Sequence, residues 1–132
     1  MTYAGDLTPQ AAFELLTSDD ALLLDVRSPD EWQHGGVPDV PGAAFVPWAL
    51  TLGGPLNADF VAQAQAAGAT PGRPVVALCR SGQRSIAAAH ALTGAGLGPV
   101  YNVLSGFEGD VGADGQRGHT GWRADGLPWR SL

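Results

Sequence analysis

The residue with the clearest chemical potential is Cys79, the only cysteine in the chain. It ends the apolar run at residues 74–79 (PVVALC), and Gly82 and Arg84 follow it closely. A strand, a short glycine-containing loop and a helix starting at about Arg84 would place the thiol beneath backbone N–H groups and the positive end of a helix. Such donors favour the thiolate, the nucleophilic form of cysteine. The segment therefore predicts a reactive sulfur atom that needs no histidine as a general base.

Two arginines accompany the cysteine and point to an anionic substrate. A guanidinium group binds oxyanions through two parallel hydrogen bonds, so we expect Arg80 to contact the substrate. Arg84 has two open interpretations, because it could contact the substrate or pair with Asp25 and hold the loop in shape. The remaining residues expected to bind the substrate or form the loop are Ser81, Gly82, Gln83 and Ser85.

An inert, buried thiol is the main alternative for Cys79, because lone cysteines are commonly small apolar core residues. Its position at a strand end, beside a glycine and two arginines, favours the reactive interpretation. A single cysteine also excludes an intramolecular disulfide and a cysteine metal cluster. The three histidines are scattered along the sequence, so we expect neither a metal site nor a cofactor.

Length and composition indicate one globular domain over residues 1–132. The chain has 132 residues, of which 45% are hydrophobic and 15% charged, and this is enough to bury a core. Thirteen acidic residues against seven arginines give a net charge of -6, which argues against binding to nucleic acid or an anionic membrane. No apolar run reaches the roughly 18 residues of a membrane span, and the N-terminus has no basic leader. We therefore expect a soluble, cytoplasmic protein.

Short buried strands alternate with helices along the chain, a pattern typical of an α/β domain with a parallel sheet. Such sheets bind ligands beyond the carboxyl ends of their strands. We expect strands at residues 21–26, 42–46, 74–79 and 99–104. We expect helices at residues 9–17, 30–34, 57–67 and 84–92. The glycine-rich residues 110–132 should wrap the core, with Trp122 and Trp129 as anchors.

Three motifs in order resemble those of single-domain rhodanese sulfurtransferases. Residues 79–85 (CRSGQRS) are similar to the active-site loop C-x-x-G-x-R-S of that family. Residues 24–32 (LDVRSPDEW) resemble its upstream D-V-R-x-x-x-E-aromatic signature, and residues 103–107 (VLSGF) its final strand and glycine turn. The match spans about residues 8–109, the expected core. The resemblance implies an open, mainly parallel five-stranded sheet with helices on both faces.

The resemblance also implies a reaction. Cys79 would take the outer sulfur of thiosulfate or a similar small anionic donor and release sulfite. It would carry the sulfur as a persulfide and pass it to a thiophilic acceptor such as cyanide, a thiol or a protein partner. Asp25 and Arg27 are expected to support the loop, and direct substrate contact by Arg27 is the less favoured alternative.

The sequence departs from the family pattern at two places. Residues 34–43 (HGGVPDVPGA) stand where the family commonly has G-H-I-P-G-A, and Asp110 stands where a tryptophan often closes the final turn. Both departures lie where the resemblance implies the rim of the pocket, so they bear on which acceptor the protein would use.

Two other functions compete with the sulfurtransferase interpretation. Phosphatases of related fold carry C-x5-R, whereas Cys79 and Arg84 enclose four residues, and the shorter loop suits a sulfur atom better than a phosphate. An arsenate reductase would need a second cysteine. A non-catalytic binding module is the other alternative, although inactive members typically lack the cysteine that this chain keeps.

Overall fold

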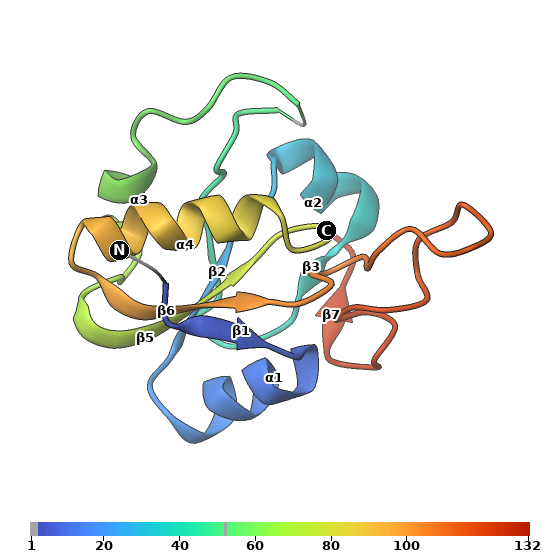
Figure 1. The fold of residues 1–132 in the computed structure, drawn as a ribbon, viewed down its shortest axis with the longest axis horizontal. Coiled ribbons are helices and arrows are strands. Elements are labelled where there is room, and N and C mark those ends of the chain that lie inside the picture. Colours follow the sequence, from blue (N-terminus) through green and yellow to red (C-terminus); the bar gives the residue numbers. More distant parts are fainter. Residues whose placement is uncertain (1–2, 52) are drawn as a thin grey trace.

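A five-stranded sheet forms the centre of the protein in a computed structural model that describes residues 3–51 and 53–132 (Figure 1). The strands lie in the order β1-β6-β5-β2-β4, and all neighbouring strands run parallel. Their bounds are Gly5–Leu7 (β1), Leu22–Asp25 (β2), Ala44–Phe45 (β4), Pro71–Leu78 (β5) and Gly98–Val103 (β6). The predicted α/β fold with an open, parallel five-stranded sheet is confirmed.

In the described part of the chain, helices cover both faces of this sheet. They are α1 (Pro9–Ser18), α2 (Pro29–Gly35), α3 (Phe60–Ala66) and α4 (Arg84–Gly94). Figure 1 shows α1 on one face, α3 and α4 on the other, and α2 beside the start of α4. The first helix begins as its sequence predicts, because the Thr8 side chain accepts a hydrogen bond from the N–H of Ala11 at 3.1 Å. None of these helices, within the residues described, is long and apolar enough to cross a membrane.

The helix predicted over residues 57–67, with Asn57 as its cap, begins two residues later than expected. Asp59, not Asn57, is the residue that precedes its first turn. The Oδ1 of Asn57 accepts a hydrogen bond from the N–H of Asp59 at 3.1 Å, and its Nδ2 donates to the carbonyl of Pro47 at 3.0 Å. Asn57 thus forms a side-chain turn that leads into α3, a common competing role for asparagine before a helix.

Three short strands have no counterpart among the predicted elements. They are β1, β3 (Val37–Pro38) and β7 (Trp129–Arg130). Strands β3 and β7 pair with each other in antiparallel orientation, outside the main sheet. Each of the three is too short to show an apolar run or an alternation, so only tertiary pairing reveals it.

Strand β2 and the second half of β5, residues 75–78, are buried on both faces and separate two apolar cores. The core beneath α3 and α4 includes Leu22, Leu24, Val26, Val75, Ala77 and Cys79. The core on the side of α1 includes Leu23, Val76, Leu78, Phe107 and Trp122. Alternate residues of each strand therefore enter opposite cores, as expected for a covered parallel sheet.

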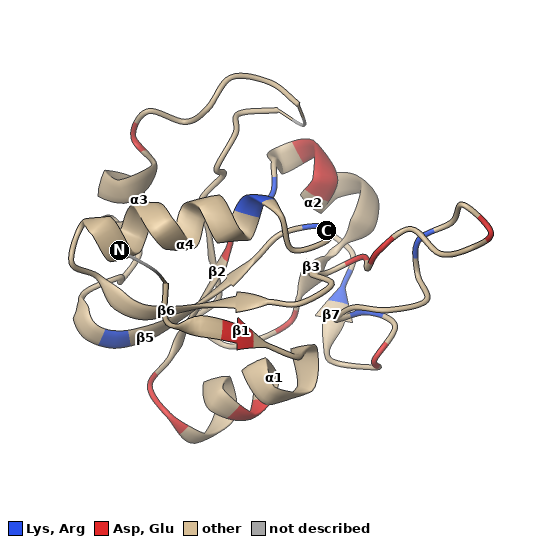
Figure 2. Ribbon diagram, viewed as in Figure 1, with Lys and Arg blue, Asp and Glu red and all other residues tan. Residues whose placement is uncertain are grey.

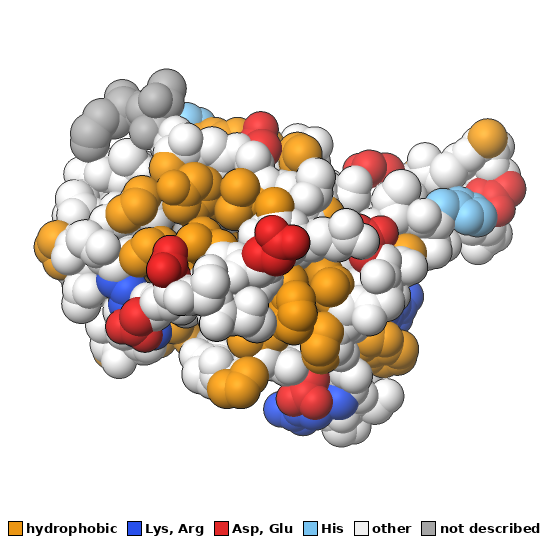
Figure 3. Space-filling view, turned by 90° about the horizontal axis from the view of Figure 1, so that it is seen from below, with side chains coloured by type: hydrophobic (Ala, Val, Ile, Leu, Met, Phe, Trp, Pro, Cys, Tyr) orange, Lys and Arg blue, Asp and Glu red, His pale blue; other side chains and the backbone are white. Residues whose placement is uncertain are grey.

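The segment that follows Gly109 extends away from the body of the protein and then returns to the second core and to β3. Figures 1 and 3 show part of this segment projecting from the body as an arm. Trp122 then enters the second core, where it is fully buried, and its Nε1 donates to the carbonyl of Pro128 at 2.8 Å. Trp129 is 43% exposed and belongs to β7. The tail is thus held by one buried indole and by backbone pairing with β3.

Gly106 provides a test of the packing where the turn after β6 meets the loop after β5. Its φ is +58°, and a Cβ there would overlap the carbonyl oxygen of Cys79. Gly96 also has a positive φ, +80°, but a Cβ there would meet open space. We expect Gly106→Ala to lower the free energy of unfolding by about 1–3 kcal/mol more than Gly96→Ala does. Urea denaturation measures both, and equal losses would contradict this packing.

Candidate active site

Cys79 directly follows β5, at the end of the sheet to which the parallel strands point. The residue is 1% exposed. The N–H of Gly82 donates a hydrogen bond to its Sγ at 3.1 Å, and the Ser85 Oγ lies 3.1 Å from the same sulfur atom. Both partners belong to the short path from β5 into α4, so the sulfur atom meets one backbone donor and one hydroxyl.

The expected cradle of several amides around the sulfur atom is only partly present. Over residues 3–51 and 53–132, Gly82 is the one residue whose backbone N–H donates to Sγ, whereas the sequence predicted donors from the whole loop. Gly82 has a φ of +101°, a conformation that glycine adopts readily, so the chain can turn at the residue whose N–H meets the sulfur atom. Ser85 reaches the sulfur atom with its side chain from the first turn of α4.

The turn after β6 holds the carbonyl groups of the same loop. The N–H of Phe107 donates to the carbonyl of Cys79 at 2.8 Å. The N–H groups of Glu108 and Gly109 donate to the carbonyl of Arg80 at 2.9 and 3.2 Å. This turn also accepts a hydrogen bond at the Gly106 carbonyl from the tail. The turn that contains the motif at residues 103–107 therefore holds the backbone of the loop that carries Cys79 in place.

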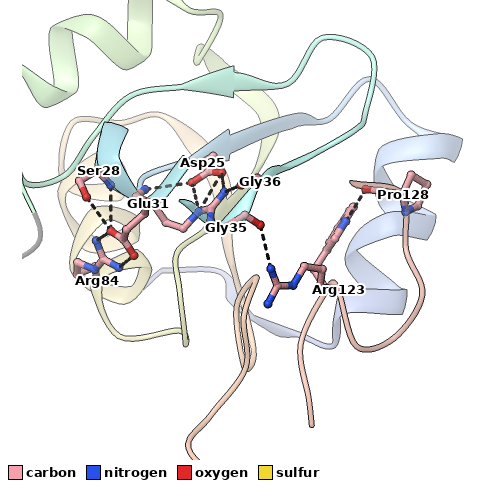
Figure 4. A network of polar contacts seen from close by, with 10 residues as sticks. Asp25, Ser28, Glu31, Gly35, Gly36, Arg84, Arg123 and Pro128 are labelled. Atoms are coloured by element: carbon pink, nitrogen blue, oxygen red, sulfur yellow. Dashed lines mark hydrogen bonds and ion pairs between the residues drawn. The ribbon is translucent and has the colours of Figure 1, made fainter. Parts of the chain in front are cut away.

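Arg84 pairs with Glu31, so the pairing with Asp25 considered from the sequence is wrong. Its Nη1 and Nη2 lie 2.6 and 2.8 Å from the two carboxylate oxygens of Glu31 (Figure 4). Glu31 also accepts from the N–H and the hydroxyl of Ser28, at 3.1 and 2.9 Å, and so caps α2. The pair links the first turn of α4 to α2.

The surroundings of the pair shift the pKa of both members away from neutrality. Burial alone would raise the pKa of Glu31, but the hydrogen bonds from Arg84 and Ser28 outweigh burial and lower it. Burial would lower the pKa of Arg84, but its hydrogen bonds and attraction to Glu31 raise it. The negative charge of a Cys79 thiolate acts on Arg84 in the same direction. Both members of the pair are therefore ionised at neutral pH.

Asp25 instead pairs with Arg27, and both side chains are fully buried. The Nη2 of Arg27 lies 2.7 Å from the Asp25 carboxylate and donates to the carbonyl of Gly36 at 2.8 Å (Figure 4). The guanidinium carbon lies 4.2 Å from the centre of the Phe107 ring. Arg27 thus joins the end of β2, the end of α2 and the turn after β6, and it presents no exposed surface to a ligand.

Arg80 differs from Arg84 in its surroundings. Within the described residues, no carboxylate lies within ion-pair distance of Arg80, and its buried Nε has no hydrogen-bond partner. Figure 2 shows the arginine positions mainly at the end of the sheet to which the strands point. Next to the loop lies a hollow of 320 Å³, lined in part by Ser81, Gly82 and Gln83. Arg80 is therefore the loop cation with unused hydrogen-bonding capacity.

Asn102 on β6 is a polar residue at this site that the sequence analysis did not single out. The Ser85 hydroxyl donates to its Oδ1, and its Nδ2 donates to the Oδ1 of Asp6 at 3.0 Å. Asn102 is 1% exposed. A single polar residue inside the apolar run at residues 99–104 was the available signal.

Two tryptophans near the site pack against other aromatic rings. Trp32 and Trp48 stack edge to face on Phe45 and Phe60, with ring centres 5.5 and 5.1 Å apart. All three histidines are exposed. Across the described residues, no group of three or more His, Cys, Asp or Glu side chains could hold a metal ion.

The departure from the family pattern at residues 34–43 has a structural role. The extra residues contain β3, in which Val37 lies opposite Arg130 and Pro38 opposite Trp129 of β7. The Arg123 side chain also donates to the carbonyl of Gly35 at 3.0 Å (Figure 4). The longer segment therefore supplies the edge on which the tail docks.

Comparison with known proteins agrees with this architecture. Residues 8–112 match the family described as rhodanese-like domain, and the chain belongs to that family. The structure is similar to the crystal structure of Rv0390 from M. tuberculosis, with 49% sequence identity and a TM-score of 0.90. That similarity covers 99% of this chain and 100% of the other.

Two further relatives carry functional descriptions. The thiosulfate sulfurtransferase GlpE of Pseudomonas syringae pv. syringae (strain B728a) is 32% identical over 108 residues, which cover 82% of this chain and 88% of the relative. The polysulfide-sulfur transferase homodimer from Wolinella succinogenes is 27% identical with a TM-score of 0.65. That similarity covers 98% of this chain and 80% of the Wolinella succinogenes chain.

The Glu31–Arg84 pair predicts a specific pH dependence of stability. The folded protein lowers the pKa of Glu31 from 4.5, so the ionised carboxylate contributes stability above that pH and loses it as the pH falls through the lower folded value. We expect Glu31→Gln to cost about 1–3 kcal/mol at pH 7, with the difference from wild type shrinking as the pH falls below 4.5 and through the lower folded pKa.

Urea denaturation at several pH values measures this difference. Asp20→Asn is the control, because the Asp20 carboxylate is 94% exposed and lies 3.4 Å from Arg73. We expect that variant to match wild type throughout. A loss in Glu31→Gln that did not change with pH would contradict the role of the ionised pair.

Proposed function

We propose that this protein is a sulfurtransferase that moves sulfane sulfur from thiosulfate, or a similar small anionic donor, to a thiophilic acceptor. The observation that carries the proposal is the position of Cys79. The only thiol of the chain directly follows β5 and meets the Gly82 N–H and the Ser85 hydroxyl at the start of α4. Membership of the rhodanese-like family and the sulfur-transfer activities described for two relatives support it.

The proposed reaction consists of two displacements at sulfur. In the first, the Cys79 thiolate attacks the outer sulfur of thiosulfate, a new S–S bond forms, and the original S–S bond breaks with its electron pair leaving on sulfite. In the second, cyanide or a thiolate attacks the terminal sulfur of the Cys79 persulfide, and the electron pair of the breaking bond returns to Cys79. The steps balance without an oxidant, a reductant or a cofactor.

The residues of the loop have separate proposed roles. The Gly82 N–H, 3.1 Å from Sγ, stabilises negative charge there, and the Ser85 hydroxyl at the same distance does so when it turns its proton from Asn102 to the thiolate. Ser81 and Gln83, on either side of Gly82, complete the loop. Arg80 attracts the anionic part of the donor, because its guanidinium has no carboxylate partner in the described structure.

The two ion pairs, one fully and one partly buried, are proposed to position these groups. Glu31 fixes Arg84 in the first turn of α4, next to Ser85. Asp25 fixes Arg27 against Phe107, whose N–H holds the carbonyl of Cys79. Arg84 is therefore assigned to the scaffold rather than to substrate binding.

Burial of the nucleophile favours sulfur over phosphate as the transferred group. Cys79 is 1% exposed, and four residues separate it from Arg84. A terminal sulfur atom can approach such a site end-on, whereas a tetrahedral phosphate needs a wider loop. The same restriction applies to the acceptor, which is a small anion, a small thiol or a thiol on an extended segment of a protein partner.

Persulfide formation provides the test of the proposed function. After incubation with thiosulfate, intact mass spectrometry should show a gain of one sulfur atom, with release of sulfite, and cyanide should remove the added sulfur as thiocyanate. Cys79→Ser should remain unmodified, because it keeps the size of the side chain but not the thiolate. An unmodified wild-type mass would favour a non-catalytic binding module, and an equal gain in Cys79→Ser would exclude Cys79 as the carrier.

Arg80 can be tested by comparing two donors. Loss of a hydrogen bond to a charged group costs about 1.5–3 kcal/mol, so Arg80→Ala should lower kcat/KM for thiosulfate by about 10- to 100-fold. The loss with an uncharged persulfide donor should be much smaller. Arg73→Ala removes the same charge near the opposite end of β5 and should leave both donors unaffected. Equal losses with the two donors would remove Arg80 from the donor site.

A further inference from the structure

The hollow of 320 Å³ lies directly against the loop that surrounds Cys79. Gly82 belongs to both, because its N–H donates to the Sγ of Cys79 at 3.1 Å and the residue also lines the hollow. The other walls come from β1, from the first turn of α4, from β6 and from the turn that follows β6. A molecule bound in this hollow is therefore a neighbour of the loop that would hold the persulfide.

The charged side chains of the hollow are acidic. They are Asp6 on β1 and Asp110 after β6, and no arginine or histidine is among the described residues that line it. Across the described chain, no cationic side chain lies within ion-pair distance of either carboxylate. The hollow therefore presents negative charge that the protein itself does not neutralise.

Hydrogen bonds hold one oxygen of each carboxylate in place. The Oδ1 of Asp6 accepts from the Tyr3 hydroxyl at 2.8 Å and from the Nδ2 of Asn102 at 3.0 Å. The Oδ2 of Asp110 accepts from the Ser105 hydroxyl at 2.9 Å. Among the described residues, the second oxygen of each carboxylate has no hydrogen-bond partner. The two groups are thus oriented in advance, which lowers the entropic cost of binding a cation.

Two apolar side chains complete the hollow. Ile86, in the first turn of α4, is half-buried, and Leu104, directly after β6, is 43% exposed. Apolar surface of this kind binds methylene groups and does not compensate the loss of water from an oxyanion. The hollow therefore suits a ligand that combines a short apolar part with a positive charge.

This chemistry does not suit thiosulfate, the donor in the proposed reaction. Thiosulfate is a dianion, and the two carboxylates would repel it. Arg80, the loop cation without a carboxylate partner, is not among the described residues that line the hollow. The surroundings of the loop thus contain one cation that suits an anionic donor and a separate acidic hollow that suits the second substrate.

We propose that this hollow is the acceptor subsite and that it selects thiols that carry a positively charged group, with Asp6 and Asp110 as the specificity-determining residues. The inference rests on the proposed function, in which the Cys79 persulfide gives its terminal sulfur to a thiol. The acceptor thiolate attacks that sulfur, a new S–S bond forms, and the bond to Sγ breaks with its electron pair returning to Cys79. The positive group belongs either to a small aminothiol or to a lysine or arginine beside a cysteine of a protein partner.

Acceptors of different charge test this selectivity. The protein is loaded with thiosulfate, freed of excess donor and mixed with cysteamine, which is cationic, with neutral 2-mercaptoethanol or with anionic 3-mercaptopropionate. Intact mass spectrometry follows the loss of the added sulfur, and each rate constant is expressed per thiolate form of the acceptor. The readout is the ratio of the rate constants for cysteamine and 2-mercaptoethanol, because comparing this ratio between variants cancels the intrinsic reactivity of each thiol.

Asp6→Asn and Asp110→Asn should each lower this ratio about two- to fivefold, as expected for the loss of an exposed charge pair, and together about tenfold. The ratio of 3-mercaptopropionate to 2-mercaptoethanol should rise in the same variants, because a repulsion is removed. Opposite shifts for a cationic and an anionic acceptor would not arise from a loosened site. Asp20→Asn is the matched control, because it removes the same charge before β2, at the opposite end of the sheet, and should keep the wild-type ratios.

Two cysteine peptides distinguish the source of the positive charge. One has its cysteine between two lysines and the other between two glutamates, and their rate ratio is compared between wild type and the two variants. A change in the peptide ratio alone identifies a segment of a protein partner as the acceptor. A change in the cysteamine ratio shows that a small aminothiol is sufficient. Either result supports the acidic acceptor subsite.

Unchanged ratios in both variants, with the small thiols and with the peptides, would overturn the inference, and so would an equal loss in Asp20→Asn. Failure of the wild-type protein to form a persulfide with thiosulfate would instead count against the proposed donor. The protein is then loaded with sodium tetrasulfide, and the same ratios decide the acceptor subsite. No persulfide from either source would overturn both the proposed function and this inference.

Discussion

The proposed reaction must place negative charge on a sulfur atom that lies in an apolar core, and this is the constraint on which the proposed site depends. Cys79 shares its core with Val75 and Ala77, and burial of a charge is unfavourable unless hydrogen-bond donors compensate. The Gly82 N–H and the Ser85 hydroxyl are the groups that reach Sγ. The surrounding structure keeps these two groups in place.

The scaffold holds the donors from both sides of the loop. The turn after β6 binds the carbonyls of Cys79 and Arg80, so the loop backbone cannot rotate freely. The Glu31–Arg84 pair ties the first turn of α4 to α2. The tail adds a second layer, because Trp122 enters the core beside Phe107 and β7 pairs with β3. The protein has a net charge of -6, and two of its arginines near the site, Arg27 and Arg84, are paired with carboxylates.

The sequence predicts the elements that have a strong local pattern. The apolar run before Cys79 corresponds to β5, and the alanine-rich segment from Arg84 corresponds to α4. Strands β1, β3 and β7 have three residues or fewer, and their existence depends on pairing with distant partners. Local pattern therefore identifies four strands of the sheet and its helices, but not the edge strand β1 or the docking of the tail.

The same distinction applies to the site. The motif places Cys79, Gly82 and Ser85 in one turn, because they are close in sequence. The partner of Arg84 is 53 residues away, and Asp6 is 96 residues from Asn102. The sequence analysis considered Asp25 as the partner of Arg84, whereas the fold places Glu31 there. For the same reason, the hydrogen-bond chain through Asn102 cannot be derived from local patterns.

The most direct test of the central claim is a crystal structure of the protein after reaction with thiosulfate. The account predicts one additional sulfur atom bonded to the Sγ of Cys79 and enclosed by the loop at residues 80–85. A bare thiol at full donor occupancy, or a donor bound elsewhere with Sγ sealed in the core, would contradict it.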